Sequence, residues 1–114
     1  MHEMSLAEGV IQVLEDNAKS QGFSRVKKVW LEIGLLSQVE VESMRFCFEA
    51  VCRGSIAEGS ELEIIETGGK GWCHQCSQQF DYSARYDPCP LCGGYQVQVV
   101  AGEEMRVKEL EVSD

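Results

Sequence analysis

The chain has 114 residues, of which 44% are hydrophobic and 25% charged, a composition typical of an ordinary soluble globular protein. Ten lysines and arginines against nineteen aspartates and glutamates give a net charge of −9, and the basic residues are scattered, which argues against nucleic acid as a partner. The apolar stretches are short, and no basic segment with an apolar run behind it opens the chain. We therefore expect no membrane segment, no secretory signal and a cytoplasmic location.

The first predicted element is an amphipathic helix over residues 5–21. Ser5 and Glu8 have the spacing of a capping box at its start, and Gly22 stands where many helices end with glycine. Its apolar residues recur at three- and four-residue intervals: Leu6, Val10, Val13 and Leu14. Residues 23–33 then alternate as a strand does, with Val29, Leu31 and Ile33 on one face.

A second helix is predicted over residues 38–53, with Ser37 and Glu40 as a second capping box. Its expected buried stripe consists of Val41, Met44, Phe48, Val51 and Cys52, with Cys47 at the margin. A short strand follows around Leu62 and Ile64. Residues 105–112 form the last predicted strand, with an irregularity at Glu109 where the alternation slips.

The segment between the last two strands has a different composition. Residues 67–71 and 101–102 are rich in glycine, and we expect them to be flexible hinges. We therefore predict an α+β fold, in which two helices and a mixed sheet of three to four strands form a domain over residues 1–68 plus 103–114. Residues 69–102 are predicted to be an inserted zinc-ribbon domain.

Four of the six cysteines form two Cys-x-x-Cys pairs with twelve residues between them, a spacing typical of a tetrahedral metal site: Cys73, Cys76, Cys89 and Cys92. Such a site has no open position for a substrate, and metal binding would supply the folding energy of the module. Structural zinc is the favoured ion. Iron in the same four-thiolate shell and a redox-active cysteine pair are the alternatives. His74 is expected to be a solvated turn residue, and Cys47 and Cys52 inert core thiols.

The chain opens with Met1, His2 and Glu3, which together offer nitrogen ligands. A bulky second residue such as His2 prevents removal of Met1, so the α-amine, the His2 amide and the His2 imidazole can chelate one ion, and the Glu3 amide can complete a square. Square-planar nitrogen ligation is typical of Ni(II) or Cu(II). An incidental histidine without a metal is the alternative.

Taken together, these features resemble the HypA/HybF family of nickel metallochaperones, which serve maturation of [NiFe]-hydrogenases and sometimes of urease. The resemblance covers the whole chain and is carried by the opening Met-His-Glu, the paired Cys-x-x-Cys motifs and three further segments: residues 29–34, 46–51 and 107–112.

This resemblance implies that His2 binds Ni(II) with the Met1 amine and backbone nitrogens, and that Glu3 supports the site. It also implies that Cys73, Cys76, Cys89 and Cys92 bind Zn(II). An acidic residue at the position of Glu40 is associated with the nickel end in this family, whereas the capping box gives Glu40 a purely structural role.

The resemblance further implies a chaperone rather than an enzyme. Its expected partners are a nickel-handling GTPase and the hydrogenase large-subunit precursor. A monomer and a domain-swapped homodimer are both compatible with the sequence. The alternative function is a zinc-ribbon protein-interaction module without nickel delivery, and a redox switch through the cysteine pairs is the third.

Overall fold

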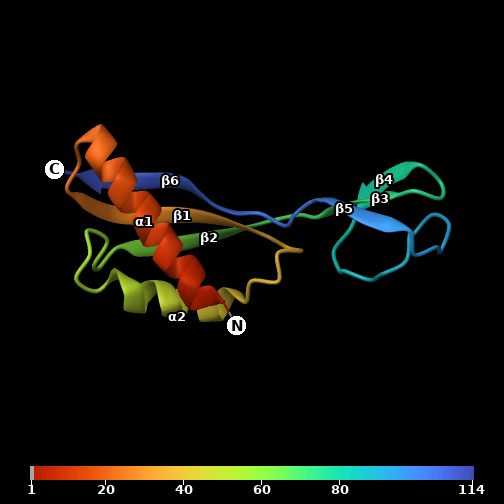
Figure 1. Cartoon of the computed structure of the whole chain (residues 1–114), viewed down its shortest axis with the longest axis horizontal. Coiled ribbons are helices and arrows are strands. Elements are labelled where there is room, and N and C mark those ends of the chain that lie inside the picture. The colour runs from red at the N-terminus through yellow and green to blue at the C-terminus, as the bar shows by residue number, and fades with distance from the viewer. Residues whose placement is uncertain (1) are drawn as a thin grey trace. The chain divides into compact units, whose positions relative to one another are not determined.

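The computed structural model describes residues 2–114 of the chain (Figure 1). Its helices and strands in chain order are α1 (Glu3–Gln21), β1 (Arg25–Gly34), α2 (Val41–Cys52), β2 (Glu61–Thr67), β3 (Lys70–Cys73), β4 (Gln78–Asp81), β5 (Val97–Ala101) and β6 (Met105–Ser113). Two helices and a mixed sheet form an α+β fold, and the strands between β2 and β6 form a sheet of their own, as the sequence predicts.

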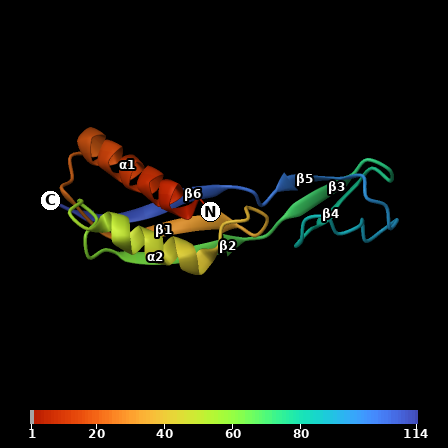
Figure 2. The ribbon, with the colours of Figure 1, turned by 60° about the horizontal axis from the view of Figure 1, so that its bottom comes forward.

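The first sheet has the strand order β2-β1-β6. Backbone hydrogen bonds join Ser24 to Ser113 and Gly34 to Glu104, so β1 and β6 run antiparallel. Further bonds join Val26 to Ile56 and Leu35 to Thr67, so β1 and β2 run parallel, with α2 as the crossover between them. The sheet is therefore mixed, and α1 and α2 pack against each other over one of its faces (Figure 2).

The core lies between the helices and that face of the sheet. Its fully buried side chains include Leu14, Val29, Leu31, Ile33 and Met44. Val29, Leu31 and Ile33 share the buried face of β1, as the alternation predicts. On the opposite face the Lys28 ammonium lies 4.6 Å from the centre of the Trp30 ring and 3.1 Å from the Glu63 carboxylate.

The start of α1 differs from the prediction. The helix begins at Glu3 with His2 as its N-cap residue, and no side chain of residues 2–114 caps it. Ser5 therefore lies inside the helix, and the predicted capping box of Ser5 and Glu8 is wrong. The predicted end is confirmed, because Gly22 adopts a left-handed conformation (φ 78°) and donates its N–H to the Ala18 carbonyl.

The second capping box is also wrong. α2 begins at Val41, and Glu40 is itself the N-cap residue, with a carboxylate that accepts a hydrogen bond from the Ser43 N–H. Ser37 lies in the turn before the helix rather than at its cap. Cys47 is buried in the core and not at its margin, whereas Val41 and Val51 are half-buried.

The second sheet has the order β4-β3-β5, and both pairs are antiparallel. Cys73 at the end of β3 pairs with Gln78 in β4 and with Val97 in β5. In β6, Lys108 and Glu109 are both exposed, which confirms the predicted irregularity of the alternation.

The predicted hinges are packed segments. Lys70 and Gly71 belong to β3, and a Cβ atom on Gly69 would overlap the Tyr82 carbonyl oxygen and the Leu36 side chain. A Cβ atom on Gly34 would likewise overlap the carbonyl oxygen of Gly102. Glycine is needed at these positions because backbones approach closely. The flexibility of the two glycine-rich segments stays a prediction.

The chain divides into two compact units. Unit 1 comprises Met1–Leu31, Val39–Ile64 and Val107–Asp114, and unit 2 comprises Glu32–Gln38 and Ile65–Arg106. The turn at residues 34–38 belongs to unit 2 because the Leu36 N–H donates to the Gly102 carbonyl and the Arg85 Nε donates to the Leu36 carbonyl. Within residues 2–114, no helix combines the length and the apolar character that crossing a membrane requires.

Candidate metal centres

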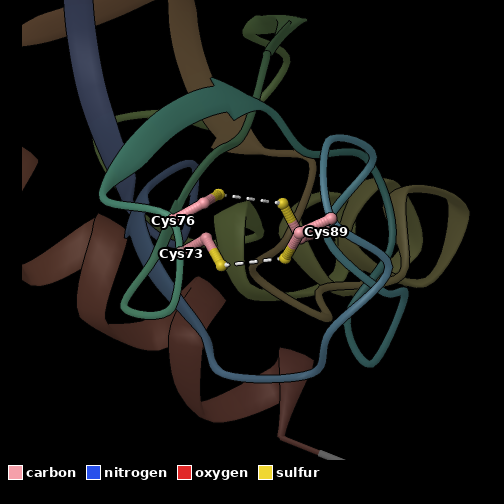
Figure 3. A group of neighbouring side chains, drawn as sticks. Cys73, Cys76 and Cys89 are labelled. Carbon is pink, nitrogen blue, oxygen red and sulfur yellow. Dashed lines mark hydrogen bonds between the residues drawn. The ribbon is translucent and has the colours of Figure 1, made fainter.

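The two Cys-x-x-Cys pairs come together in unit 2. The Sγ atoms of Cys73, Cys76, Cys89 and Cys92 all lie within 4.8 Å of one another. Cys73 and Cys76 point from the turn after β3 toward the loop that carries Cys89 and Cys92 (Figure 3). Cys73 and Cys89 are buried, while Cys92 is exposed, so the cluster lies at the surface of the module.

The distances between these thiols fit a tetrahedral ion. The Sγ atoms of Cys73 and Cys92 are 3.6 Å apart, and those of Cys76 and Cys89 are 3.7 Å apart. Four sulfur atoms at about 2.3 Å from a zinc ion would stand about 3.8 Å from one another at the corners of a tetrahedron. The four thiols are therefore able to hold a metal ion with little rearrangement.

Local backbone geometry directs the thiols inward. The Ser77 N–H donates to the Cys73 carbonyl with Ser77 in the left-handed region, and the Gly93 N–H donates to the Cys89 carbonyl with Gly93 at φ 75°. Each Cys-x-x-Cys segment is thus a tight turn that brings both of its sulfur atoms to one side. The Leu91 N–H also lies 3.4 Å from the Cys89 sulfur, which is the amide-to-sulfur contact that a thiolate needs.

The thiols differ in how readily they lose a proton. The Cys76 N–H donates to the Cys73 sulfur and lowers the pKa of Cys73 to about 7. Desolvation, with the neighbouring thiols, raises the pKa of Cys76 to about 12. Cys73 therefore loses its proton more readily than Cys76, and a bound cation would favour the thiolate form of Cys76.

The remaining cysteines and His74 lie outside this cluster. Cys47 and Cys52 are buried in α2, and burial raises the pKa of Cys52 to about 11, as expected of an inert core thiol. His74 is exposed, and its Nε2 atom lies 2.8 Å from the Gln98 side-chain oxygen.

The N-terminal candidates lie at the start of α1. His2 is exposed at the N-cap position, and Met1 with its α-amine lies outside the described residues. Glu3 is buried, with only 3% of its surface exposed. Its Oε2 atom accepts a hydrogen bond from the Glu40 N–H at 3.1 Å.

The Glu3 carboxylate is only half satisfied. Its Oε1 atom is buried, and no hydrogen bond reaches it within residues 2–114. The N–H groups of Glu40 and, to a smaller extent, of Glu3 and His2 lower the pKa of Glu3 against the opposing effect of desolvation. A buried anion thus stands beside His2 with one oxygen free to interact with a cation or a further donor.

Sequence reasoning missed the burial of Glu3 and its bond to the Glu40 backbone. Nothing local marks this contact, since the two residues are 37 positions apart. It also missed the turn at Leu36 and its hydrogen bond to Arg85. The sequence signal for that turn was the pair of glycines at residues 68–69. We interpreted the pair as flexible, whereas Gly69 permits Leu36 to pack closely against the backbone.

The fold and the four-thiol cluster define a small metal-binding protein with a zinc-ribbon-like module. A family model described as "Hydrogenase/urease nickel incorporation, metallochaperone, hypA" matches residues 1–112. The chain belongs to this family of nickel metallochaperones, as the resemblance predicted.

Individual relatives also match nearly the whole length of this chain. It is 62% identical to the hydrogenase maturation factor HypA of Azotobacter chroococcum and 58% identical to that of Azotobacter vinelandii, over 98% of this chain and 99% of each relative. The solution structure of the Ni metallochaperone HypA from Helicobacter pylori superposes with a TM-score of 0.73 at 28% identity, over 99% of this chain and 98% of that one. These relatives are named maturation factors or metallochaperones rather than enzymes.

Proposed function

We propose that this protein binds Ni(II) at its N-terminus and delivers it during maturation of [NiFe]-hydrogenase, with urease as an alternative client. The family match supports the class of function. The observation that supports the place is the buried Glu3 carboxylate, with an oxygen unpaired within residues 2–114, directly beside the exposed His2. The partners in this proposal are a nickel-handling GTPase and the hydrogenase large-subunit precursor.

The donor set in this proposal consists of nitrogens at the start of α1. The Met1 amine, the His2 imidazole and the amides of His2 and Glu3 would surround the ion. The first amides of a helix have no partner within it, and the ladder of α1 opens with the bond from the Leu6 N–H to the His2 carbonyl. Amide nitrogens that lose their protons become anions, which the positive end of the helix dipole stabilises.

Glu3 has a supporting role in this site. Its carboxylate is held by the Glu40 N–H, and its position beside the first amides of α1 places negative charge next to a bound cation. Glu40 contributes its backbone N–H, while its side chain is occupied by the Ser43 N–H. The structure therefore favours the structural role of the Glu40 carboxylate over nickel ligation.

The four cysteines would hold Zn(II) in a closed site with no position for a substrate. Zinc binding would supply the folding energy of residues 69–102. These residues would form a domain inserted into the nickel-binding domain of residues 1–68 and 103–114. Neither metal is required to perform a reaction, so the protein acts as a chaperone and not as an enzyme. Thiolate ligands need a reducing compartment, which supports a cytoplasmic location.

Transfer is tested with protein that begins at Met1 and carries zinc. The nickel-loaded chain is mixed with the GTPase and the apo precursor, and the nickel retained by the re-isolated precursor is measured. We expect transfer from the unaltered chain and little from His2→Ala. Equal transfer by both proteins would contradict delivery from the N-terminus, and a chain that binds zinc alone would be a zinc-ribbon interaction module.

A further inference from the structure

The zinc-ribbon-like module of unit 2 has a second feature, an open aromatic cleft of about 190 Å³. Three tyrosines and two valines form most of its lining: Tyr82, Tyr86, Tyr95, Val97 and Val99. Tyr82 is buried, whereas Tyr86 is 85% exposed and Tyr95 is 74% exposed. Two exposed tyrosines and apolar side chains thus line one cleft, whose volume is close to that of one long side chain.

Tyr86 is held in an unfavourable backbone conformation. Its φ of 71° is left-handed, a region that bulky residues rarely occupy and that costs on the order of 1–3 kcal/mol. The next residue is fixed by the Tyr82 hydroxyl, which donates to the Asp87 carbonyl at 2.7 Å. A strained residue that presents its ring to solvent gains nothing for the core, which points to a binding role for the ring.

The charges at the cleft favour a cation. The Arg85 guanidinium is neutralised by an ion pair with Glu103, and its Nε donates to the Leu36 carbonyl at 3.0 Å. The Asp87 carboxylate is exposed and has no ion-pair partner within residues 2–114. The cleft therefore carries one uncompensated negative charge beside two exposed aromatic rings.

We propose that this cleft binds a lysine or arginine side chain from a basic segment of a partner protein. The faces of Tyr86 and Tyr95 attract the cation, and Asp87 pairs with its charged head. The valines and Tyr82 contact its aliphatic stem. The chain's net charge of −9 steers a basic segment toward the protein and a nucleic acid away from it.

This inference goes beyond nickel delivery and is independent of it, because every residue of the cleft lies outside the N-terminal site. It assigns the module a recognition role in addition to a structural one. Aromatic residues that surround an anchoring side chain are typical of the energetic centres of interfaces.

The test uses the full chain loaded with zinc and short glycine-serine peptides with one central residue, which is arginine, lysine, glutamine or leucine. Amide NMR spectra are followed during titration at low salt. We expect saturable shifts of Tyr86, Tyr95, Val97 and Val99 with the arginine and lysine peptides, at dissociation constants on the order of millimolar, and much weaker shifts with glutamine. Equal binding of the leucine or glutamine peptide would overturn the proposal.

Matched variants locate the interaction. Asp87→Asn should weaken binding of the arginine peptide by about two- to five-fold, whereas Glu111→Gln, which removes the same charge from the exposed part of β6, should leave it unchanged. Tyr86→Gly should relieve strain and raise the melting temperature while weakening binding by about two- to five-fold, and Tyr86→Phe should retain binding. Equal effects of Asp87→Asn and Glu111→Gln, or full binding by Tyr86→Gly, would contradict the assignment.

Discussion

Glu3 shows how one side chain links the first residues of the chain to the rest of unit 1. Its carboxylate is buried and accepts the Glu40 N–H, which is the backbone donor of the α2 N-cap residue. A buried carboxylate needs such partners because desolvation penalises its charge. The bond also fixes the start of α1, where His2 lies.

The lowered pKa of Glu3 gives a prediction for the metal-free protein. Because the carboxylate is more acidic in the folded state than its ordinary value near 4.3, its contribution to stability is present above that value. This contribution is lost as the pH falls through the lower, folded-state pKa. The difference in unfolding free energy between the unaltered chain and Glu3→Gln should therefore be constant from pH 7 to 5 and change below pH 4. A difference that stays the same down to pH 2 would contradict this account.

At the scale of elements, the turn at residues 34–38 is built by contacts that are distant in sequence. Leu36 is buried against Gly69, and its N–H donates to the Gly102 carbonyl. The Arg85 Nε donates to the Leu36 carbonyl. The close approach of Gly34 to Gly102 leaves no room for a side chain. Packing of this turn therefore depends on glycine as much as on apolar burial.

Gly34→Ala tests that packing. The added methyl group must displace backbone, so we expect a loss of about 1–3 kcal/mol in the free energy of unfolding, measured by chemical denaturation. Gly9→Ala is the matched control, because Gly9 is exposed in α1 and a Cβ atom there meets nothing within 4 Å. That control should gain roughly 0.5–1 kcal/mol from helix propensity. An unchanged free energy of unfolding in Gly34→Ala would show that the turn at residues 34–38 is not tightly packed.

The four-thiol cluster makes a prediction for the module. Cys92→Ala leaves three thiols, so zinc should be lost and the amides of residues 70–101 should lose protection from hydrogen exchange. The helices and β1 should stay protected, because their core lies in unit 1. Cys47→Ala removes a thiol from the core instead, and it should retain zinc. Full zinc content in Cys92→Ala would contradict a four-cysteine site.

Features set by local chemistry were predictable from the sequence. The alternation of Val29, Leu31 and Ile33, the glycine cap at Gly22 and the spacing of the cysteine pairs each depend on a few neighbouring residues. All three agree with the structure.

Features set by contacts between distant residues were not predictable from the sequence. Ser5 and Ser37 have the right spacing for capping boxes, but the helices begin at other residues. α1 begins at Glu3, whose buried carboxylate accepts the Glu40 N–H, and Glu40 itself caps α2. The same holds for Gly69, whose role depends on Leu36, 33 residues earlier in the chain. The partner residue in each case is invisible to a local pattern.

At the scale of the whole molecule, the two candidate metal centres differ in kind. The four-thiol cluster is closed and suits a resident ion that stabilises its module. The proposed N-terminal site includes His2, which is exposed, and an exposed site would suit an ion that must be released. The family is that of nickel metallochaperones, and our proposal adds one permanent and one transferable metal to that description.

The most direct test of this account is nickel binding by zinc-loaded protein in three forms: the chain that begins at Met1, its His2→Ala variant, and the chain with one residue added before Met1. Affinity is measured by calorimetry, and coordination by the absorption of square-planar Ni(II). We expect one nickel per chain in the first form and a loss of more than about 100-fold in the other two, with unchanged zinc content and melting temperature. Unchanged nickel affinity in both altered forms would contradict the N-terminal site.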